Sequence, residues 1–408
     1  MATLAYAYKG RDADGKVVKG RLDAATEGAV ASRLRTMGVS PISIQESKDG
    51  TGLSKEIRIP GFSKGVGLKD LSIMSRQMAT MIAAGLSLLR TLTILSEQTA
   101  NKELSRILRA VTTDVESGIS LSDALNKHAE SFPPIMINLI RAGEIGGFLD
   151  DALETIAKNF ESEVKLRGTI KSALTYPVIV LIMSLVSVVA MLVFIVPVFQ
   201  KMFASLGGTL PLPTLILVWL SSVMTWLAPV LIVVGIAFSV WWKANKNTER
   251  IRKLVDPVKL KLPVFGKLFV KLAIARFSRN FASMMGAGVP ILQALQIVGE
   301  TSGNWVVENG LRNVAESVRQ GKSIGEPLAL EPVFPSMVTQ MITVGEDAGA
   351  LEQMLSKIAD FYDEEVQSAT EQLTAMIEPL MVAFLGVVVG GMIVALYLPI
   401  FNIFNLIK

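Results

Sequence analysis

The stretch RAGEIGGFL, Arg141 to Leu149, returns about two hundred residues later as TVGEDAGAL, Thr343 to Leu351. Both stretches contain the motif Gly-Glu-x-x-Gly-x-Leu, and each lies some thirty residues ahead of a long hydrophobic run. A turn that occurs twice in the same relation to a hydrophobic run predicts that a whole structural module is duplicated.

Other motifs repeat in the same order around this turn. SRQMATMIAAGLSLLRTLTILSEQT (75–99) matches SRNFASMMGAGVPILQALQIVGETS (278–302), and GISLSDAL (118–125) matches GKSIGEPL (321–328). These pairs are separated by 203 residues, and one residue is lost before Phe132-Pro133 matches Phe334-Pro335. From there the separation is 202, which places Pro177 on Pro379 and Pro197 on Pro399. The repeated unit is therefore a polar segment of about a hundred residues followed by a hydrophobic one.

The hydrophobic segments are long enough to cross a membrane. Half of the 408 residues are hydrophobic, and charged residues make up 19%, below the roughly 25% of soluble domains. About 20 apolar helical residues span a bilayer. We predict spans at 172–197, 214–242 and 373–400, with an external loop at 198–213 and an external tail at 401–408.

Basic residues predict the orientation of these spans. Lys165, Arg167 and Lys171 precede the first span, and five lysines and arginines follow the second, whereas the loop between them has only Lys201. By the positive-inside rule, the N-terminus and residues 243–372 are cytoplasmic. Both copies of the repeat then point the same way, as a parallel repeat.

The polar part of each copy reads as a helical bundle. Leu88, Leu92 and Leu95 recur at helical spacing and predict one apolar stripe, as do their counterparts in the second copy. Ser120 and Ser323 are predicted helix N-caps. We expect two homologous cytoplasmic bundles of about six helices each, at 68–171 and 243–372. Since no turn signal follows the Gly-Glu-x-x-Gly motif, the last helix of each bundle should continue into its span. The predicted fold class is a mainly α integral membrane protein.

The first residues differ from the rest. LAYAYKGRDADGKVVKGRLDA (4–24) alternates apolar and polar residues around Asp14-Gly15, which predicts a hairpin. A short helix capped at Thr26 and ended by Gly38, then a strand, complete a small ββαβ domain at 1–46, and 47–67 reads as a flexible linker. Residues 10–17 resemble a phosphate-binding loop, but Val17 replaces the required hydroxyl residue and the loop joins two strands.

Composition argues against most chemistry. The chain has no cysteine and a single histidine, His128, which excludes disulfides, thiolate ligands and nearly all imidazole-based catalysis. The net charge of +4 is accounted for largely by basic residues beside the spans, so we expect no direct nucleic-acid binding. We expect no catalytic residue, no cofactor and no metal site.

Four carboxylates are candidate interaction residues because they recur at matched positions. Glu144 and Glu346 lie in the repeated turn, and Glu163 and Glu365 lie on the helix that leaves it. One interpretation is structural, since an acid ahead of the long helix complements its dipole. The other is a docking surface, or a cation site between the two modules.

Three further residues mark the point where bundle gives way to membrane. Pro177 and Pro379 fall there in both copies, and a proline inside a helix removes a hydrogen bond and bends the helix. A hinge at these positions would let a moving bundle tilt its span. Glu378 enters the third span, where an ionisable group either serves a function or extends to the interface.

Together these motifs support a family resemblance. The series SRQMATMIAAGLSLLRTL, ESGISLSDAL, FPPIMINLIRAGEIGGFLDDAL and TYPVIVLI, repeated in the second copy, resembles the inner-membrane platform family of type IV pilus and type II secretion machines (PilC/GspF). The similarity covers residues 68–404, and the leading domain is also similar to that of many members.

The resemblance implies a non-enzymatic platform in the bacterial inner membrane that forms homodimers or larger homo-oligomers. Its implied partners are a hexameric cytoplasmic ATPase, pilin or pseudopilin subunits, and other inner-membrane assembly proteins. The bundles would meet the ATPase and the spans would meet the pilin helices. The alternative is a membrane carrier or scaffold unrelated to filaments.

Overall fold

The computed structural model describes residues 4–11, 17–24, 26–46, 65–205, 210–246, 248–263 and 265–406. The chain forms two compact units, 1–64 and 65–408, and each is described by itself. The predicted hairpin turn at Asp14-Gly15, the phosphate-loop resemblance around it and most of the predicted linker lie outside the described residues. So do 206–209 of the predicted loop and the last two residues of the predicted tail.

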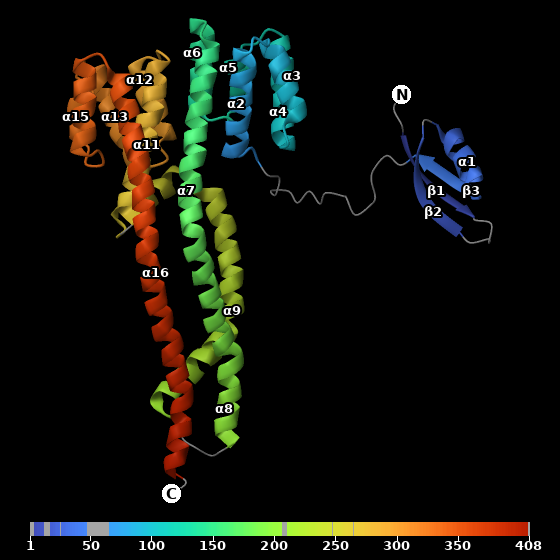
Figure 1. The fold of residues 1–408 in the computed structure, drawn as a ribbon, viewed down its shortest axis with the longest axis vertical. Helices are drawn as coiled ribbons and strands as arrows, with labels where there is room; N and C mark the ends of the chain where they lie inside the picture. The colour runs from blue at the N-terminus through green and yellow to red at the C-terminus, as the bar shows by residue number, and fades with distance from the viewer. Residues whose placement is uncertain are drawn as a thin grey trace. The chain divides into compact units, whose positions relative to one another are not determined.

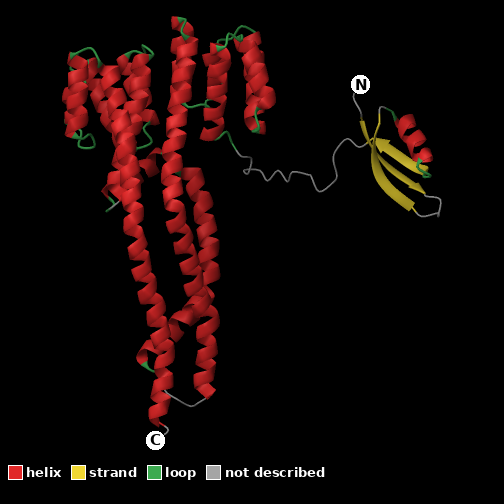
Figure 2. Ribbon diagram, viewed as in Figure 1, coloured by secondary structure: helices red, strands yellow, loops and turns green. Residues whose placement is uncertain are grey.

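The N-terminal unit has the predicted ββαβ order (Figure 2). Its elements are β1 (Leu4–Arg11), β2 (Val17–Ala24), α1 (Glu27–Thr36) and β3 (Ser40–Glu46). Both neighbours of β1 run antiparallel to it, so the sheet order is β2-β1-β3. Thr26 caps α1 by accepting a hydrogen bond from the Ala29 N–H, and Gly38 follows the helix with a φ of +74°. Val30 and Leu34 of α1 are fully buried against the sheet.

The first bundle begins the second unit. It contains α2 (Leu68–Ala83), α3 (Leu88–Gln98), α4 (Lys102–Glu116), α5 (Leu121–Asn126), α6 (Pro134–Gly146) and the first part of α7 (Leu149–Ala190). The apolar stripe predicted on α3 is confirmed, because Leu92 and Leu95 are buried in the core and Leu88 packs at its edge.

The second bundle repeats this order after one additional helix. It contains α10 (Glu249–Lys261), α11 (Phe265–Gly286), α12 (Ile291–Thr301), α13 (Trp305–Arg319), α14 (Gly325–Ala329), α15 (Ser336–Asp347) and the first part of α16 (Leu351–Leu406). Most of the buried apolar residues of both bundles belong to one continuous cluster. The two copies of the repeat therefore share a core, with α6 and α7 of the first packed against α11 and α12 of the second.

Three helical segments are long and apolar enough to cross a membrane: Leu149–Phe203, Leu212–Asn245 and Leu351–Phe401. In Figure 1, α7 and α16 run in the same direction away from the bundles, and α9 (Leu212–Asn245) returns. The chain is thus a membrane protein with its repeats in parallel. At 1.5 Å per residue, the 56-residue α16 is about 84 Å long.

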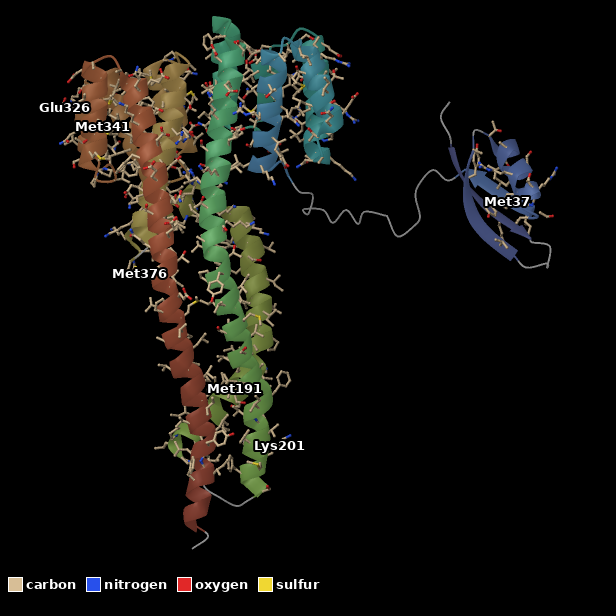
Figure 3. The ribbon with its side chains drawn as sticks, in the orientation of Figure 1. Met37, Met191, Lys201, Glu326, Met341 and Met376 are labelled. Carbon is tan, nitrogen blue, oxygen red and sulfur yellow. The ribbon has the colours of Figure 1, made fainter. Side chains whose placement is uncertain are left out.

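The first span is longer than predicted. After α7 the chain continues as a π-helix, η1 (Met191–Ile195), and then as α8 (Val196–Ser205). Residues 198–205, assigned from the sequence to an external loop, are helical; Val196 and Phe203 are buried, and α8 packs against α9 and α16. Figure 3 shows Met191 and Lys201 in the part of the spans remote from the bundles, with Lys201 nearer to the end.

Candidate functional site

The two glycines of the repeated motif make the corner between α6 and α7, and between α15 and α16. Gly147 and Gly349, the second glycine of each copy, have φ angles of +75° and +64°, which L-residues rarely adopt. The preceding glycines allow close packing. A Cβ on Gly143 would lie 2.8 Å from the Ala152 Cβ, and a Cβ on Gly345 would lie 2.9 Å from the Met354 Cγ. Each corner thus holds its last two helices in close contact.

The glutamate between these glycines caps a different helix. Glu144 points back to the short helix α5, where its Oε1 accepts a hydrogen bond from the Leu121 N–H at 2.6 Å. Its Oε2 accepts from the Ser122 N–H at 3.1 Å. The first turn of a helix leaves N–H groups without partners, and a carboxylate there also complements the helix dipole. Ser120 adds the predicted cap by accepting from the Asp123 N–H.

Glu346 makes the equivalent contact in the second copy. Its carboxylate accepts from the Ile324 N–H at 2.8 and 2.9 Å and from the Gly325 N–H at 3.2 Å. The predicted N-cap role of Ser323 is wrong, since α14 begins after Ile324 and has no side-chain cap from its own flank. The carboxylate of Glu346 satisfies this helix start instead.

These contacts bear on the two interpretations of Glu144 and Glu346. The dipole that each carboxylate complements is that of the short helix some 22 residues earlier in the chain, and not that of the long helix that follows. Within the described residues, no group of three or more histidines or carboxylates has the arrangement of a metal site.

Glu163 and Glu365 each form an ion pair with a basic residue of α11. Glu163 of α7 contacts Arg276 at 2.7 Å and Arg167 at 2.6 Å, and its side chain is mostly buried. Glu365 of α16 contacts Lys271 at 2.6 Å. The first pair joins the two bundles, whereas the second lies within one. The two glutamates thus occupy matched positions in the sequence but make different kinds of contact.

A polar seam next to Glu163 continues the contact between the bundles. The Asn159 side chain of α7 donates to the Asn280 Oδ1 of α11 at 3.0 Å, and both residues are buried. Asn280 in turn donates to the Thr301 hydroxyl. Buried amides with partners favour one arrangement of the packed helices, because sliding would leave them unsatisfied.

A second arginine pair occurs at repeat-equivalent positions. Arg76 of α2 donates to both carboxylate oxygens of Glu161 on α7, at 2.6 and 2.7 Å. These hydrogen bonds hold the pKa of Glu161 below its ordinary value. In the second copy Arg279 contacts Asp363 at 2.6 Å, but burial raises the pKa of Asp363 above its ordinary value although Arg279 opposes this.

Pro177 and Pro379 lie inside uninterrupted α-helix, in α7 and α16. Pro177 is buried, whereas Pro379 and the neighbouring Glu378 are exposed. Glu378 makes no ion pair with any residue that the structure describes. The departure from α geometry in the first span occurs further along, in η1, which ends two residues before Pro197.

Hydroxyl groups of α9 satisfy carbonyls that two other prolines leave free. Pro399 has no N–H for the Ala395 carbonyl four residues earlier, and the Thr214 hydroxyl donates to that oxygen at 2.5 Å. In η1 the bonding shifts to five residues, so that Pro197 leaves the Leu192 carbonyl free. The Ser221 hydroxyl donates to it at 2.5 Å. A carbonyl without a hydrogen bond is costly in lipid. Through these two hydroxyl groups, α9 is bonded to both the first and the third span.

An open apolar groove lies between α7 and α16 inside the predicted membrane region. We call it the membrane groove, and it is lined by Ile179, Val180, Met183, Ser184, Ser187, Leu385, Gly386 and Val389. A Cβ on Gly386 would meet no atom within 4 Å, so the groove has room for an apolar chain.

The duplicated geometry agrees with a family comparison. The sequence model of "Type II secretion system (T2SS), protein F" matches residues 74–197 and 277–399, two segments that begin 203 and end 202 residues apart. The family's N-terminal domain model matches residues 1–45. The chain belongs to the type II secretion system protein F family.

Curated relatives from type IV pilus and type II secretion systems are similar to this chain over nearly its whole length. The type IV pilus assembly protein PilC of Thermus thermophilus is 44% identical over 399 residues, covering 98% of each chain. PilC of Myxococcus xanthus is 41% identical, covering 100% of this chain and 97% of its own. The type II secretion system protein F of Xanthomonas campestris is 31% identical, covering 98% and 99%.

Several residues that form contacts between helices of this protein were not predicted from the sequence. Arg76 and Arg279 stood in the repeated SRQ and SRN triplets, where a cation at matched positions was a usable signal. Thr214 and Ser221 are hydroxyl residues seven apart in an apolar helix, which places them on one face. Asn159 and Asn280 gave no signal, because neither has an asparagine at its matched position.

Proposed function

We propose that this chain is a platform protein of a bacterial inner membrane that couples a hexameric cytoplasmic ATPase to filament assembly. Filament subunits of the pilin or pseudopilin type would be brought from the membrane to the growing end. Membership of the family and the names of relatives from pilus and secretion machines support the general role. The ATPase, the filament subunits and the identity of the membrane as the inner membrane belong to the proposal.

The observation that carries the proposal is the continuity of α7 and α16. Each helix starts in a bundle core, runs without interruption into the membrane region, and lines the membrane groove there. A force applied to the bundles would therefore act directly on the groove. Basic residues beside the spans support placing the bundles in the cytoplasm, where an ATPase is found.

The membrane groove fits an apolar helix of a filament subunit. Its wall is formed by aliphatic side chains together with Ser184, Ser187 and Gly386. Small residues let two helices approach closely in lipid, where packing rather than water exclusion drives association. The bundles would bind the ATPase, and the chain would act as a homodimer or a larger assembly with other inner-membrane assembly proteins.

Filling the groove tests this proposal. Gly386→Leu places a large side chain in the groove at a position where a Cβ meets no atom within 4 Å, and we expect filament assembly to fall at least tenfold. Gly235→Leu is the matched control, since Gly235 of α9 also faces open space but lies away from the groove. Both variants should insert and accumulate normally. Wild-type assembly in Gly386→Leu would contradict groove binding.

We further propose Pro177 and Pro379 as hinges that transmit bundle motion. Each leaves one carbonyl of its helix without an N–H donor, which lowers the energy needed to bend there. Pro177→Ala and Pro379→Ala should impair filament assembly while leaving membrane insertion intact. The assay is filament yield with immunoblotting of membranes, and normal assembly in both variants would remove the hinge.

Purification tests the partners. The solubilised chain should retain the ATPase and the filament subunits when it is isolated from its own cells. Glu144, Glu346, Glu163, Glu365 and Glu378 remain candidate contact residues, of which Glu378 is the one that is exposed and without an ion pair among the described residues. A charge reversal at Glu378 that leaves both partners bound would exclude it as a contact.

A further inference from the structure

Helix α10 carries an apolar stripe on its exposed face. Leu254 and Val258 lie four residues apart on α10, and Leu262 directly follows the end of the helix; they are 73%, 59% and 42% exposed. The opposite face of α10 is fixed to the bundle. Asp256 accepts a hydrogen bond from the Trp305 N–H at 2.9 Å, and Arg252 contacts Glu308 at 2.8 Å. The stripe is thus held outward by buried polar contacts.

The position of α10 places this stripe at the membrane surface. The span α9 ends at Asn245, after Trp241 and Trp242, which are typical of the interface. Three residues then connect it to Glu249, the first residue of α10. Three extended residues reach about 10 Å at most, so α10 starts within the headgroup layer.

Unpaired basic side chains surround the stripe. Lys246, Arg250 and Lys261 are exposed, and none forms an ion pair with any part of the chain that the structure describes. Lys253 lies over the Trp305 ring at 5.5 Å. An amphipathic helix with an apolar centre and basic edges is the pattern of helices that lie in an interface rich in acidic lipids.

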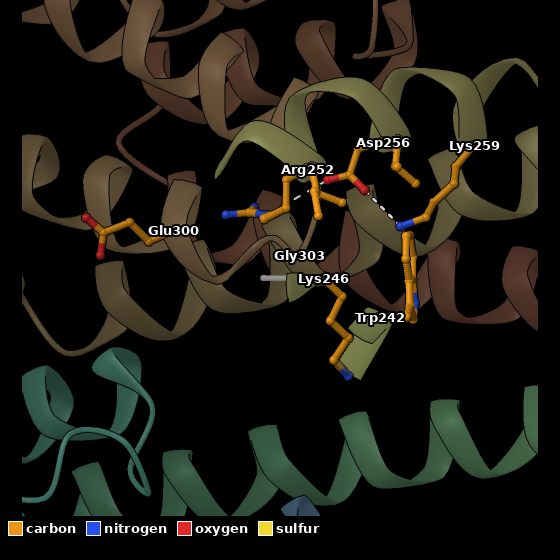
Figure 4. Close-up of a pocket in the computed structure, with 9 residues that line it drawn as sticks. Trp242, Lys246, Arg252, Asp256, Lys259, Glu300 and Gly303 are labelled. Carbon is orange, nitrogen blue, oxygen red and sulfur yellow. Dashed lines mark hydrogen bonds and ion pairs between the residues drawn. The ribbon is translucent and has the colours of Figure 1, made fainter. Parts of the chain in front are cut away.

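A pocket opens between this helix and the end of the span. We call it the basic pocket, and Figure 4 shows its lining, which includes Trp242, Lys246, Arg252, Asp256, Lys259, Glu300 and Gly303. Asp256 pairs with Lys259 at 2.8 Å and Arg252 pairs with Glu308 at 2.8 Å, so Lys246 is the cation of the pocket that has no ion pair among the described residues. Lys246 projects from the span end without such a partner, beside an indole ring that suits the headgroup level.

We propose that α10 lies in the membrane interface and that the basic pocket binds the phosphate headgroup of an acidic phospholipid. Leu254 and Val258 then enter the acyl boundary, while Lys246, Arg250 and Lys261 contact acidic headgroups. The bound lipid fixes the second bundle at a set height above the bilayer. This inference stands independently of the filament proposal.

The charge arm of the test uses the full-length protein in nanodiscs of phosphatidylethanolamine with phosphatidylglycerol. Lys246→Gln, Arg250→Gln and Lys261→Gln are combined, and retained lipids are counted by native mass spectrometry. Each basic residue near an acidic surface contributes roughly fivefold, so phosphatidylglycerol retention should fall at least about tenfold. The matched control combines Arg109→Gln, Lys322→Gln and Lys357→Gln, exposed bundle cations, and should retain lipid normally.

Two results would overturn the headgroup site. One is equal phosphatidylglycerol retention in the triple variant and the wild type. The other is displacement of the lipid by inorganic phosphate at the same concentration, which would mark a site for soluble anions. Loss of a bound protein from the triple variant with lipid retention unchanged would instead make this face a protein contact.

A second experiment measures how deep α10 lies in the membrane, and it is possible because the chain has no cysteine. Leu254→Cys and Leu330→Cys each give one labelling site, and the two leucines are similarly exposed at 73% and 79%. A fluorophore at 254 should be quenched by lipids with a nitroxide near the headgroup, and one at 330, between α14 and α15, should not. Equal quenching at both sites, or none at 254, would contradict an interfacial α10.

Discussion

The two repeats share a corner but differ in what surrounds it. In both, a glycine with positive φ lies between the last two helices of the bundle, and the glutamate ahead of it caps the start of an earlier short helix. The first repeat changes to π geometry in its span, whereas the second stays α-helical for 56 residues. The corner is thus the same in the two repeats, while the spans differ.

The caps differ between the repeats in a way that predicts the largest effect. Both glutamates satisfy two N–H groups, but α5 keeps Ser120 as a second cap and α14 has none of its own. An unsatisfied buried N–H costs roughly 1–3 kcal/mol. Each change to alanine frees two N–H groups, but in α5 the Ser120 cap on the Asp123 N–H still holds the start of the helix. We therefore expect Glu346→Ala to cost about 3 kcal/mol and Glu144→Ala about 2 kcal/mol in thermal unfolding of the solubilised protein.

The control for the caps is Glu326→Ala, an exposed acid on α14 that is labelled in Figure 3. It should leave the unfolding temperature almost unchanged. If Glu144→Ala costs as much stability as Glu346→Ala, the Ser120 cap of the first repeat contributes nothing. The two helix starts would then be equally dependent on their glutamates.

The close contacts at the corner give the next effect. An added Cβ at Gly143 meets the Ala152 Cβ and nearby backbone, which have no way to rotate aside, whereas one at Gly345 meets the flexible Met354 side chain as well as backbone. Overpacking typically costs 1–3 kcal/mol. Gly143→Ala should therefore lower the unfolding temperature more than Gly345→Ala. The reverse order would show that the backbone at the first corner can yield.

Removing one α9 hydroxyl at a time compares the first span with the third. Thr214→Val frees the Ala395 carbonyl in α16, and Ser221→Ala frees the Leu192 carbonyl in η1. Side-chain hydrogen bonds between membrane helices average about 0.6 kcal/mol, so each change should lower stability by about that amount. Thr225→Val is the control, because that hydroxyl bonds only within its own helix. Losses no larger than the control's would mean that lipid-embedded carbonyls tolerate being free.

The smallest effect is expected at the two arginine pairs, Arg76–Glu161 and Arg279–Asp363, whose contributions to stability should depend differently on pH. The lowered pKa of Glu161 means that its pair stabilises the fold above the ordinary carboxyl pKa and loses this as pH falls. The raised pKa of Asp363 has the opposite sign, since protonation relieves the burial of its charge. At pH 7, Glu161→Gln should cost about 0.2–1 kcal/mol, and the deficit should vanish in acid.

Asp363→Asn is the paired measurement. Because it removes a charge whose burial is unfavourable, it should cost less than Glu161→Gln at pH 7, and its effect should not grow as the pH is lowered. Equal losses that follow the same pH profile would show that the two pairs are equivalent after all.

The sequence predicted the features that repeat. Matching spacings gave the duplicated bundles, the parallel spans and the long helices, because apolar periodicity and turn glycines are local signals. The ββαβ order followed from alternation around one turn and from Thr26 and Gly38. The end of the first span was placed too early, since SLGGTLPLP marked only where the helix must stop, and burial of Phe203 carries it to Ser205.

The sequence did not predict contacts made across the fold. Glu144 was read against the helix that follows it, but its carboxylate reaches a helix start 22 residues earlier, which only the packing of α5 on α6 brings near. Glu163 and Glu365 matched in sequence, yet one joins the bundles and the other does not. Partner choice depends on which helix lies opposite, and that is a property of the whole core.

Site-specific crosslinking tests the central claim most directly. With no cysteine in the chain, Ser187→Cys places a single thiol in the membrane groove, and Val233→Cys places one on the open face of α9 as a control. Each is combined with a cysteine in the apolar helix of the filament subunit, and membranes are oxidised during assembly. We predict a disulfide-linked product from Ser187→Cys and none from Val233→Cys. Equal products from both positions, or none from Ser187→Cys in assembling cells, would contradict the account.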